Sequence, residues 1–203
     1  MQEIWHPTEN KINVRDYTQQ FVKVRKGREG GGVAIFTHRK VKAVFLKEYD
    51  VDNLEAVWAD VKVGNVRAVV GSVYIPPGDI TALDLLDKVI HEILQVHKQL
   101  IIGMDANSRS LLWDESCIGV CEYQKSRKMG TKVEEILDKH CLTVHNTGAP
   151  TYNSGKYCSA PDITLSTGIT RHGKVSWSVV DDELRTPHEG IMIQIGERAR
   201  VKV

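Results

Sequence analysis

Residues 100–107 read LIIGMDAN, an apolar run that ends in an acidic residue and an amide. A continuous apolar run of this length is typical of a β-strand that is covered on both faces. Asp105 and Asn107 follow at the carboxyl end of that strand, and because they are two residues apart they point to the same rim of the sheet. The run therefore predicts a buried strand that delivers two oxygen-bearing side chains to a sheet edge.

Short β-prone runs lie on both sides of this strand. Before it, four runs rich in Val, Ile and aromatic residues predict a meander of four strands, at residues 33–36, 41–46, 54–63 and 66–75. After it, four more strands are predicted at residues 142–145, 161–166, 175–180 and 191–195. Apolar residues at three-to-four spacing predict helices over residues 79–98, with Asp79 or Thr81 as the cap, and over residues 132–140. The pattern indicates an α/β fold of two packed sheets with helices outside.

The composition indicates one globular domain. The chain has 203 residues, 27 basic and 26 acidic side chains, and a hydrophobic fraction of 41%. We expect a single domain over residues 1–197, followed by a tail at 198–203. No apolar run approaches the roughly 20 residues that span a bilayer, so we expect no membrane association. Four cysteines without a CxxC pair favour reduced thiols in an intracellular compartment.

Asp105 and Asn107 are the first candidates for chemistry. Carboxylate and amide oxygens are groups that meet hard cations and phosphate in proteins. The alternative is an Asp/Asn turn after the strand, in which both side chains only hydrogen-bond the backbone. The net charge of +1 means that a polyanionic partner would be held by local patches or by a metal ion.

Four further residues carry weaker signals. Asp162 begins a β-prone stretch and could orient a histidine, and His188 lies at a loop-to-strand junction that suits this role. The alternative for His188 is an exposed loop histidine. Glu3 alone is typical of a solvated surface acid, and Tyr74 of half-buried packing with a wet hydroxyl.

The order of these residues along the chain resembles a known family. Seven blocks, which together cover nearly the whole chain, are similar to signatures of the endonuclease/exonuclease/phosphatase superfamily. The resemblance is strongest to the apurinic-type endonuclease domain at the start of non-LTR retrotransposon polyproteins, especially the insect-type branch. The blocks lie at residues 1–3, 72–77, 101–110 with Trp113, 144–146, 150–152, 161–165 and 187–189.

The resemblance implies a fold, a reaction and partners. The fold would be a four-layered α/β sandwich of the DNase I type, with two mainly antiparallel sheets flanked by helices. The reaction would be hydrolysis of a phosphodiester in one strand of double-stranded DNA with Mg²⁺ or Mn²⁺ as the cofactor. The 3′ hydroxyl so formed would prime a reverse transcriptase that follows in the intact polyprotein, and action on DNA would be nuclear.

The resemblance also implies roles for individual residues. Glu3 falls on the metal-binding glutamate of the family. Asp105 falls on the aspartate that positions or deprotonates the attacking water beside the metal, and Asn107 on a residue that holds this site and the phosphate. Tyr74 falls on a phosphate-contacting tyrosine, and the pair of Asp162 and His188 on the groups that contact the scissile phosphate.

Two basic runs, residues 23–28 and 125–128, are candidates for contacts with flanking phosphates. Equally, each run is typical of a solvated loop.

The chain departs from the family pattern in two places that bear on activity. The family has a strand with an active-site asparagine before the glutamate block, whereas here only Met1 precedes Gln2, so we expect the first strand to be missing. The last block of the family has an aspartate before its histidine, and here Pro187 takes that place without a charge. The alternatives to an active nuclease are therefore an impaired relic that binds nucleic acid or protein, and a phosphatase of the same fold.

Overall fold

The structure is a computed structural model that describes residues 1–4, 14–25, 30–64, 66–117, 124–167, 174–180 and 186–196. Its centre is a six-stranded sheet in the order β3-β4-β5-β6-β10-β7. β5 and β6 run parallel, and the other neighbours pair antiparallel. The strands are β3 (Lys42–Phe45), β4 (Glu55–Val63), β5 (Val66–Tyr74), β6 (Leu100–Asp105), β7 (Thr143–Val144) and β10 (Asp162–Ser166).

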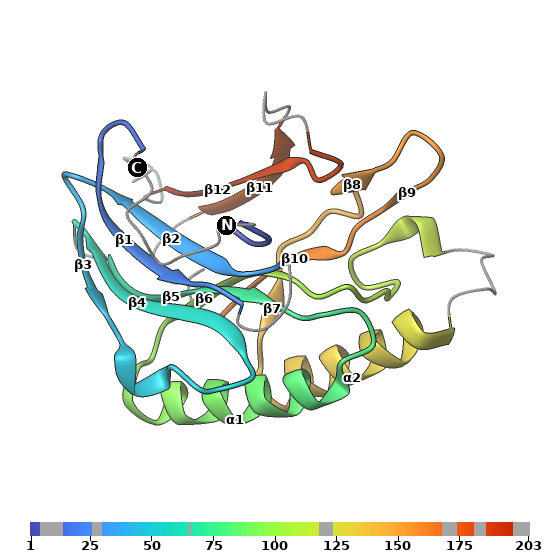
Figure 1. Cartoon of the computed structure of the whole chain (residues 1–203), viewed down its shortest axis with the longest axis horizontal. Helices are drawn as coiled ribbons and strands as arrows, with labels where there is room; N and C mark the ends of the chain where they lie inside the picture. Colours follow the sequence, from blue (N-terminus) through green and yellow to red (C-terminus); the bar gives the residue numbers. More distant parts are fainter. Residues whose placement is uncertain are drawn as a thin grey trace, which may run out of the picture.

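Two helices, α1 (Ile80–Val96) and α2 (Gln124–His140), lie side by side below the central sheet (Figure 1). α1 makes the crossover between the parallel strands β5 and β6, and it begins where the Asp79 carboxylate accepts a hydrogen bond from the Ala82 amide at 3.0 Å. α2 begins at Gln124 and not at residue 132 as predicted. The prediction missed its first turns because they are mostly polar and show no apolar spacing. The apolar stripes of both helices pack into one core with the sheet, whose largest buried side chains include Trp58, Leu86, Ile90, Ile102 and Met129.

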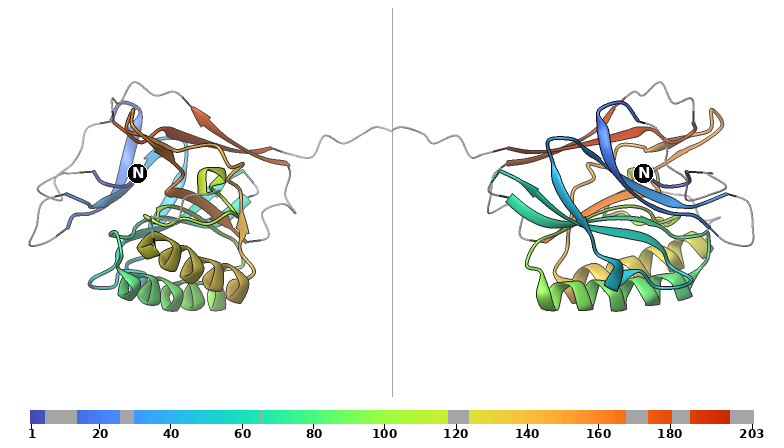
Figure 2. Two further views of the ribbon diagram at one scale, coloured as in Figure 1. Left: turned by 90° about the vertical axis from the view of Figure 1, so that its right-hand side faces the viewer. Right: turned by 60° about the vertical axis from the view of Figure 1, so that its left-hand side comes forward.

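The other face of the sheet is covered by β-structure (Figures 1 and 2). β1 (Tyr17–Lys23) pairs with β2 (Val33–His38), and β11 (Lys174–Val180) pairs with β12 (Gly190–Gly196). The prediction of an α/β sandwich is therefore confirmed, with both described helices on the same outer face. A short hairpin of β8 (Tyr152–Asn153) and β9 (Cys158–Ser159) lies beside these layers.

One part of the predicted strand order is wrong. The run at residues 33–36 does form β2, but β2 pairs with β1 in the second layer and is not the first strand of a meander with β3. Gly31 and Gly32, at φ +71° and +83°, adopt the left-handed backbone that brings the chain into β2. The partner, β1, has no clear alternation of apolar and polar residues, so the sequence did not indicate it.

Three smaller features can be compared with the expectations from the sequence. In the described residues, no helix is both long and apolar enough to span a bilayer. Cys141 and Cys158 are exposed free thiols. The run at residues 175–180 and that at 191–195 form β11 and β12, each one or two residues longer than expected.

Candidate active site

The candidate site lies at one rim of the central sheet, where β5 and β6 end and β10 begins. Tyr74 is the register partner of Asp105 across the parallel pair, and Asp162 is the register partner of Asp105 across the antiparallel pair. Three neighbouring strands thus place three of the predicted side chains in a row. The strand ends could be predicted from the sequence, but the order β5-β6-β10 that joins them could not.

Asp162 and His188 form a hydrogen-bonded pair. The His188 Nδ1 lies 2.9 Å from the Asp162 Oδ2, and the Thr151 hydroxyl donates to the same carboxylate oxygen at 2.7 Å. The side chain of Asn146 donates to the Asp162 carbonyl at 2.8 Å, which ties the strand to the loop after β7. The hydrogen bond that the His188 ring donates to the Asp162 carboxylate raises the pKa of His188 above its ordinary value, although burial acts against this. The opposite ring nitrogen, Nε2, has no hydrogen-bond partner in the described part of the chain and could meet a ligand.

Asp105 is a buried carboxyl group with 2% of its surface exposed. Burial, followed by the negative charge of Asp162, raises its pKa to about 7. The charge of His188 and a hydrogen bond from the Asn107 backbone, at 3.1 Å to Oδ1, oppose this shift. Asp105 can therefore exchange a proton near neutral pH.

Asn107 forms the backbone-bonded turn that was one of its two predicted roles, and it also lies next to the candidate site. Its backbone closes the turn with Asp105, and its side-chain Nδ2 donates to the Ile75 carbonyl at 3.0 Å. Its φ of +44° is one that Asn tolerates better than most residues. Asn107 thus fixes the loop after β6 against the end of β5, and its carbonyl oxygen is not used in these bonds.

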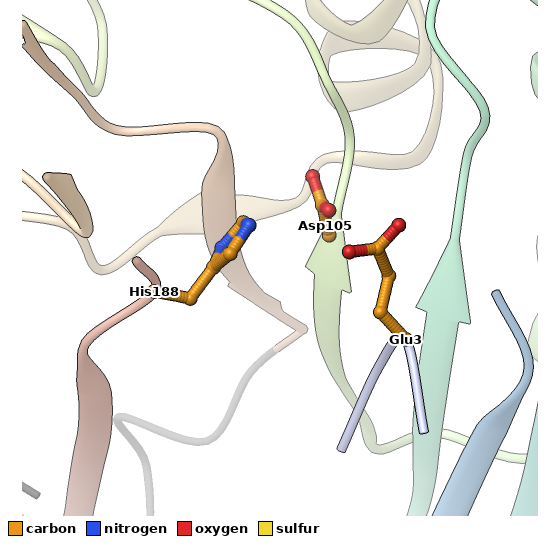
Figure 3. A group of neighbouring side chains, drawn as sticks. All are labelled: Glu3, Asp105 and His188. Atoms are coloured by element: carbon orange, nitrogen blue, oxygen red, sulfur yellow. The ribbon is translucent and has the colours of Figure 1, made fainter. Parts of the chain in front are cut away.

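Glu3 completes a cluster with Asp105 and His188. One ligand atom from each of the three lies within 4.8 Å of the other two, and Figure 3 shows the two carboxylates and the imidazole converging from separate segments. Glu3 is held there because Gln2 bridges to Val33 of β2 and its side chain donates to the Gly103 carbonyl of β6 at 2.8 Å.

This donor set fits a divalent cation. Hard ions such as Mg²⁺ prefer carboxylate oxygens, and Mn²⁺ accepts the same ligands. Glu3 and Asp105 would supply these oxygens. Because the negative charge of Glu3 adds to the cost of ionising the buried Asp105, a cation between the two carboxylates would lower that cost.

Tyr74 is buried beside the cluster and is held by two charged groups. Burial and a hydrogen bond to Glu3 raise the pKa of Tyr74 to about 12, so the phenol keeps its proton. The Arg25 guanidinium lies over the Tyr74 ring, 5.1 Å from the ring centre, and its Nε donates to the Glu55 carboxylate at 2.7 Å. No sequence pattern indicated this support, since Arg25, Glu55 and Tyr74 are distant along the chain.

The basic run at residues 23–28 therefore differs from its predicted role. Arg25 faces Glu55 and Tyr74, and Lys23 pairs with Asp50 at 2.5 Å, so neither is an exposed phosphate contact. Residues 26–28 lie outside the described part of the chain. In the second run, Lys125, Arg127 and Lys128 are exposed on the first turns of α2, and the Ser126 carbonyl accepts from the Arg109 amide of the loop that follows Asn107.

The cluster opens into a cleft of about 770 Å³ between Met1–Glu3 and β12. Its polar end contains Glu3, Asp105, Asp162 and His188, and its walls are largely apolar, with Met104, Ile163, Ile191 and Ile193. Pro187 lines the cleft beside His188 without adding a charge, yet the pairing of His188 with Asp162 is intact.

Comparison with known protein families identifies the family of the chain. Residues 68–192, more than half of its length, match the family described as endonuclease-reverse transcriptase. The chain belongs to this family. The matched region contains Tyr74, Asp105, Asp162 and His188, and Glu3 precedes it. No curated protein matches the chain.

Solved structures with the same fold include nucleases and phosphatases. The endonuclease domain of TRAS1, a telomere-specific non-LTR retrotransposon, is 20% identical with a TM-score of 0.68, over 87% of this chain and 79% of that one. The 3′ phosphatase NExo from Neisseria, bound to a product DNA hairpin, is 16% identical with a TM-score of 0.70, over 96% and 87%. An endonuclease/exonuclease/phosphatase family protein from Leptotrichia buccalis is 17% identical with a TM-score of 0.57, over 97% and 85%. These likenesses confirm the DNase I-like fold.

Proposed function

We propose that this protein is a divalent-metal-dependent endonuclease that cuts one strand of double-stranded DNA and leaves a 3′ hydroxyl. The observation that carries the proposal is the convergence of Glu3, Asp105 and His188 within 4.8 Å at the sheet rim, with Asp162 bonded behind His188. Membership of the endonuclease-reverse transcriptase family supports the same substrate class.

Glu3 and Asp105 are the residues that would hold Mg²⁺ or Mn²⁺. A cation held there would supply charge stabilisation for the phosphate oxygens. The pKa of Asp105, about 7 in the absence of metal, suits a group that positions the attacking water or accepts its proton. Asn107 keeps Asp105 in place through its hydrogen bonds to both strand ends.

His188 and Tyr74 are the side chains that would donate hydrogen bonds to the scissile phosphate. The raised pKa of His188 favours the imidazolium, whose Nε2–H can donate to a phosphate oxygen, and Asp162 and Thr151 fix the orientation of the ring. The hydroxyl of Tyr74, which donates to Glu3 in the metal-free protein, would become a second donor to the phosphate once a cation occupies the Glu3 carboxylate. Donors placed before the reaction cost no reorganisation when charge develops.

The same proposal assigns a biological setting. A nick with a 3′ hydroxyl is a primer for DNA synthesis, and the family name couples an endonuclease to a reverse transcriptase. In the intact polyprotein a downstream reverse transcriptase would extend the nick, and the reaction would take place in the nucleus. The exposed cations at the start of α2 lie near the loop that follows Asn107, because the Arg109 amide donates to the Ser126 carbonyl, and they are candidates for contacts with flanking phosphates.

Nicking of supercoiled plasmid tests the proposal. We expect Mg²⁺-dependent conversion to open circles that stops in EDTA, and a loss of at least 10²-fold in His188→Ala. His91→Ala, at an exposed position on α1, is the matched control and should nick normally. A DNA polymerase should extend the product without prior phosphatase treatment. A folded protein that nicks with neither Mg²⁺ nor Mn²⁺ would overturn the proposal.

The same assay separates the alternatives. The likeness to a 3′ phosphatase bound to DNA makes one of them specific. Release of phosphate from a 3′-phosphorylated hairpin without plasmid nicking would favour a phosphatase. DNA binding that is equal with and without EDTA, with neither reaction, would favour a binding module.

A further inference from the structure

A row of cationic side chains crosses the central sheet at the end opposite to the candidate site. Lys42 of β3 is the register partner of Lys62 of β4, and Lys62 is the register partner of Arg67 of β5. Register partners on neighbouring strands share one face and lie about 5 Å apart between their backbones. Lys42, Lys62 and Arg67 thus follow one another across three strands, and all are exposed.

Two adjoining hollows surround this row, which we call the basic trough. Their volumes are about 500 and 430 Å³, and both are lined by Asp60 and Arg67. Asp60 is the one acidic side chain among the described residues that line the two hollows. The cationic side chains are Arg39, Lys42, Lys62, Arg67 and Lys98.

The acidic groups near the trough leave two lysines without a partner. Asp60 is taken by Arg67, which donates through Nε at 2.9 Å, and Asp16 lies 3.8 Å from Arg39. Within the described part of the chain, Lys42 and Lys62 have neither an ion pair nor a side-chain hydrogen bond. Like charges that face each other across a strand pair are destabilising. An added polyanion would remove this repulsion.

We propose that the basic trough is a second nucleic-acid site, which binds the phosphodiester backbone without reading its sequence. A backbone presents one charge about every 3.4 Å along each strand of B-DNA, so it can engage successive cations of the row, whereas a single small anion cannot. Among the described residues that line the hollows, His97 is the one aromatic ring, and it packs edge-on against the Tyr49 ring with 6.2 Å between the ring centres. With no other ring for base stacking among these residues, the trough contacts backbone rather than bases.

The trough is too far from the candidate site to be part of it. Lys62 is seven residues along β4 from Glu55, which supports the site through Arg25, and seven residues of strand span about 23 Å. A duplex cut at the site would need about 7 base pairs more, at 3.4 Å each, to reach the trough. The ligand is therefore either a long flank of the DNA being cut or a separate strand such as RNA.

Binding measured in EDTA tests this proposal independently of cleavage. We would follow the fluorescence anisotropy of a 12-base-pair duplex, a 30-base-pair duplex and a 30-nucleotide RNA over a series of NaCl concentrations. For Lys42→Glu/Lys62→Glu we expect at least a 10-fold loss of affinity for the 30-base-pair duplex, the RNA or both. The slope of log K against log salt should become shallower by about 2. Loss confined to the long duplex identifies flanking DNA as the ligand, and loss confined to the RNA identifies a separate strand.

The matched control is Lys47→Glu/Lys88→Glu, which changes the net charge equally at two exposed positions outside the trough. Equal loss of affinity in the two double variants would overturn the proposal, as would equally strong competition by polyglutamate of the same charge. If the reversed variant fails to fold, Lys42→Gln/Lys62→Gln replaces it. Because no step requires catalysis, absence of nicking would overturn the proposed function and leave this test intact.

Discussion

The central sheet gathers groups of like charge near both ends of strand β5, acidic groups at one end and basic groups at the other. At the Tyr74 end, the carboxyl groups of Asp105 and Asp162 are register partners, and at the Arg67 end the partners are cations. The ends differ in burial, since Asp105 is 2% exposed whereas the cations are in water. A buried like-charge pair needs a fixed counter-charge, here His188 and the proposed cation. Water and salt screen the exposed pair, so its counter-ion can exchange.

The largest effect is expected from changing the buried end. Asp105→Asn keeps the size of the side chain and an oxygen for the Asn107 amide, but removes the charge that would bind metal and act on water. We predict a loss of at least 10³-fold in the initial rate of plasmid nicking with Mg²⁺. Asp52→Asn, an exposed position, is the control. Nicking by Asp105→Asn within 10-fold of wild type would show that the reaction does not depend on this carboxylate.

The same substitution should stabilise the metal-free protein. The pKa of Asp105 is about 7 in the folded state and 3.8 in the reference state, so ionisation opposes folding once the pH rises through this interval. In EDTA at pH 8, we expect Asp105→Asn to be more stable than wild type by on the order of 1–4 kcal/mol. The difference should shrink as the pH falls and disappear below about pH 4. Urea unfolding at several pH values measures it, and equal stability at pH 8 would contradict the assigned burial cost.

A smaller loss of nicking activity is expected from changing Tyr74 and Arg25, which lie beside the buried acidic groups. Tyr74→Phe and Arg25→Met should each slow nicking by about 10- to 100-fold, and the double variant should lose less than the product of the two, because Arg25 acts through the Tyr74 ring. Lys23→Met, in the same basic run but paired with Asp50, is the control. Effects that multiply fully would mean that Arg25 and Tyr74 act separately.

The smallest effect is expected at the exposed end. Lys62→Glu places an anion between Lys42 and Arg67, and we predict that it raises the midpoint of thermal unfolding by about 1–3 °C at low salt. The gain should fade at 1 M NaCl because the interaction is screened. Lys88→Glu should show no such gain. A lower midpoint for Lys62→Glu at low salt would mean that Lys62 stabilises the free protein.

The sequence predicted the parts of the site that depend on local pattern. The apolar run at residues 100–104 gave the central strand, and the residues that follow it, Asp105 and Asn107, do lie at the rim. The two helices were also predicted, since apolar spacing is a local property, although the polar start of α2 was not. The candidate roles of the site residues came from the family resemblance and stay predictions.

The remaining features depend on pairing between distant segments. The support of Tyr74 by Arg25 and Glu55 requires the packing of the second layer on the central sheet, and no spacing along the chain indicates it. The basic trough requires the registers of β3 with β4 and of β4 with β5, because Lys42, Lys62 and Arg67 are unremarkable as single residues. Pairing of β2 with β1 instead of β3 was missed for the same reason.

The most direct test of the account is thermal unfolding at pH 8 in EDTA and in millimolar Mg²⁺ or Mn²⁺. We would compare wild type, Asp105→Asn and Lys42→Glu/Lys62→Glu. The account predicts that the metal raises the midpoint of wild type and of the trough variant by several degrees, and leaves Asp105→Asn, which is already more stable, unchanged. An equal metal-induced rise in Asp105→Asn would contradict the claim that the buried carboxylates form the cation site.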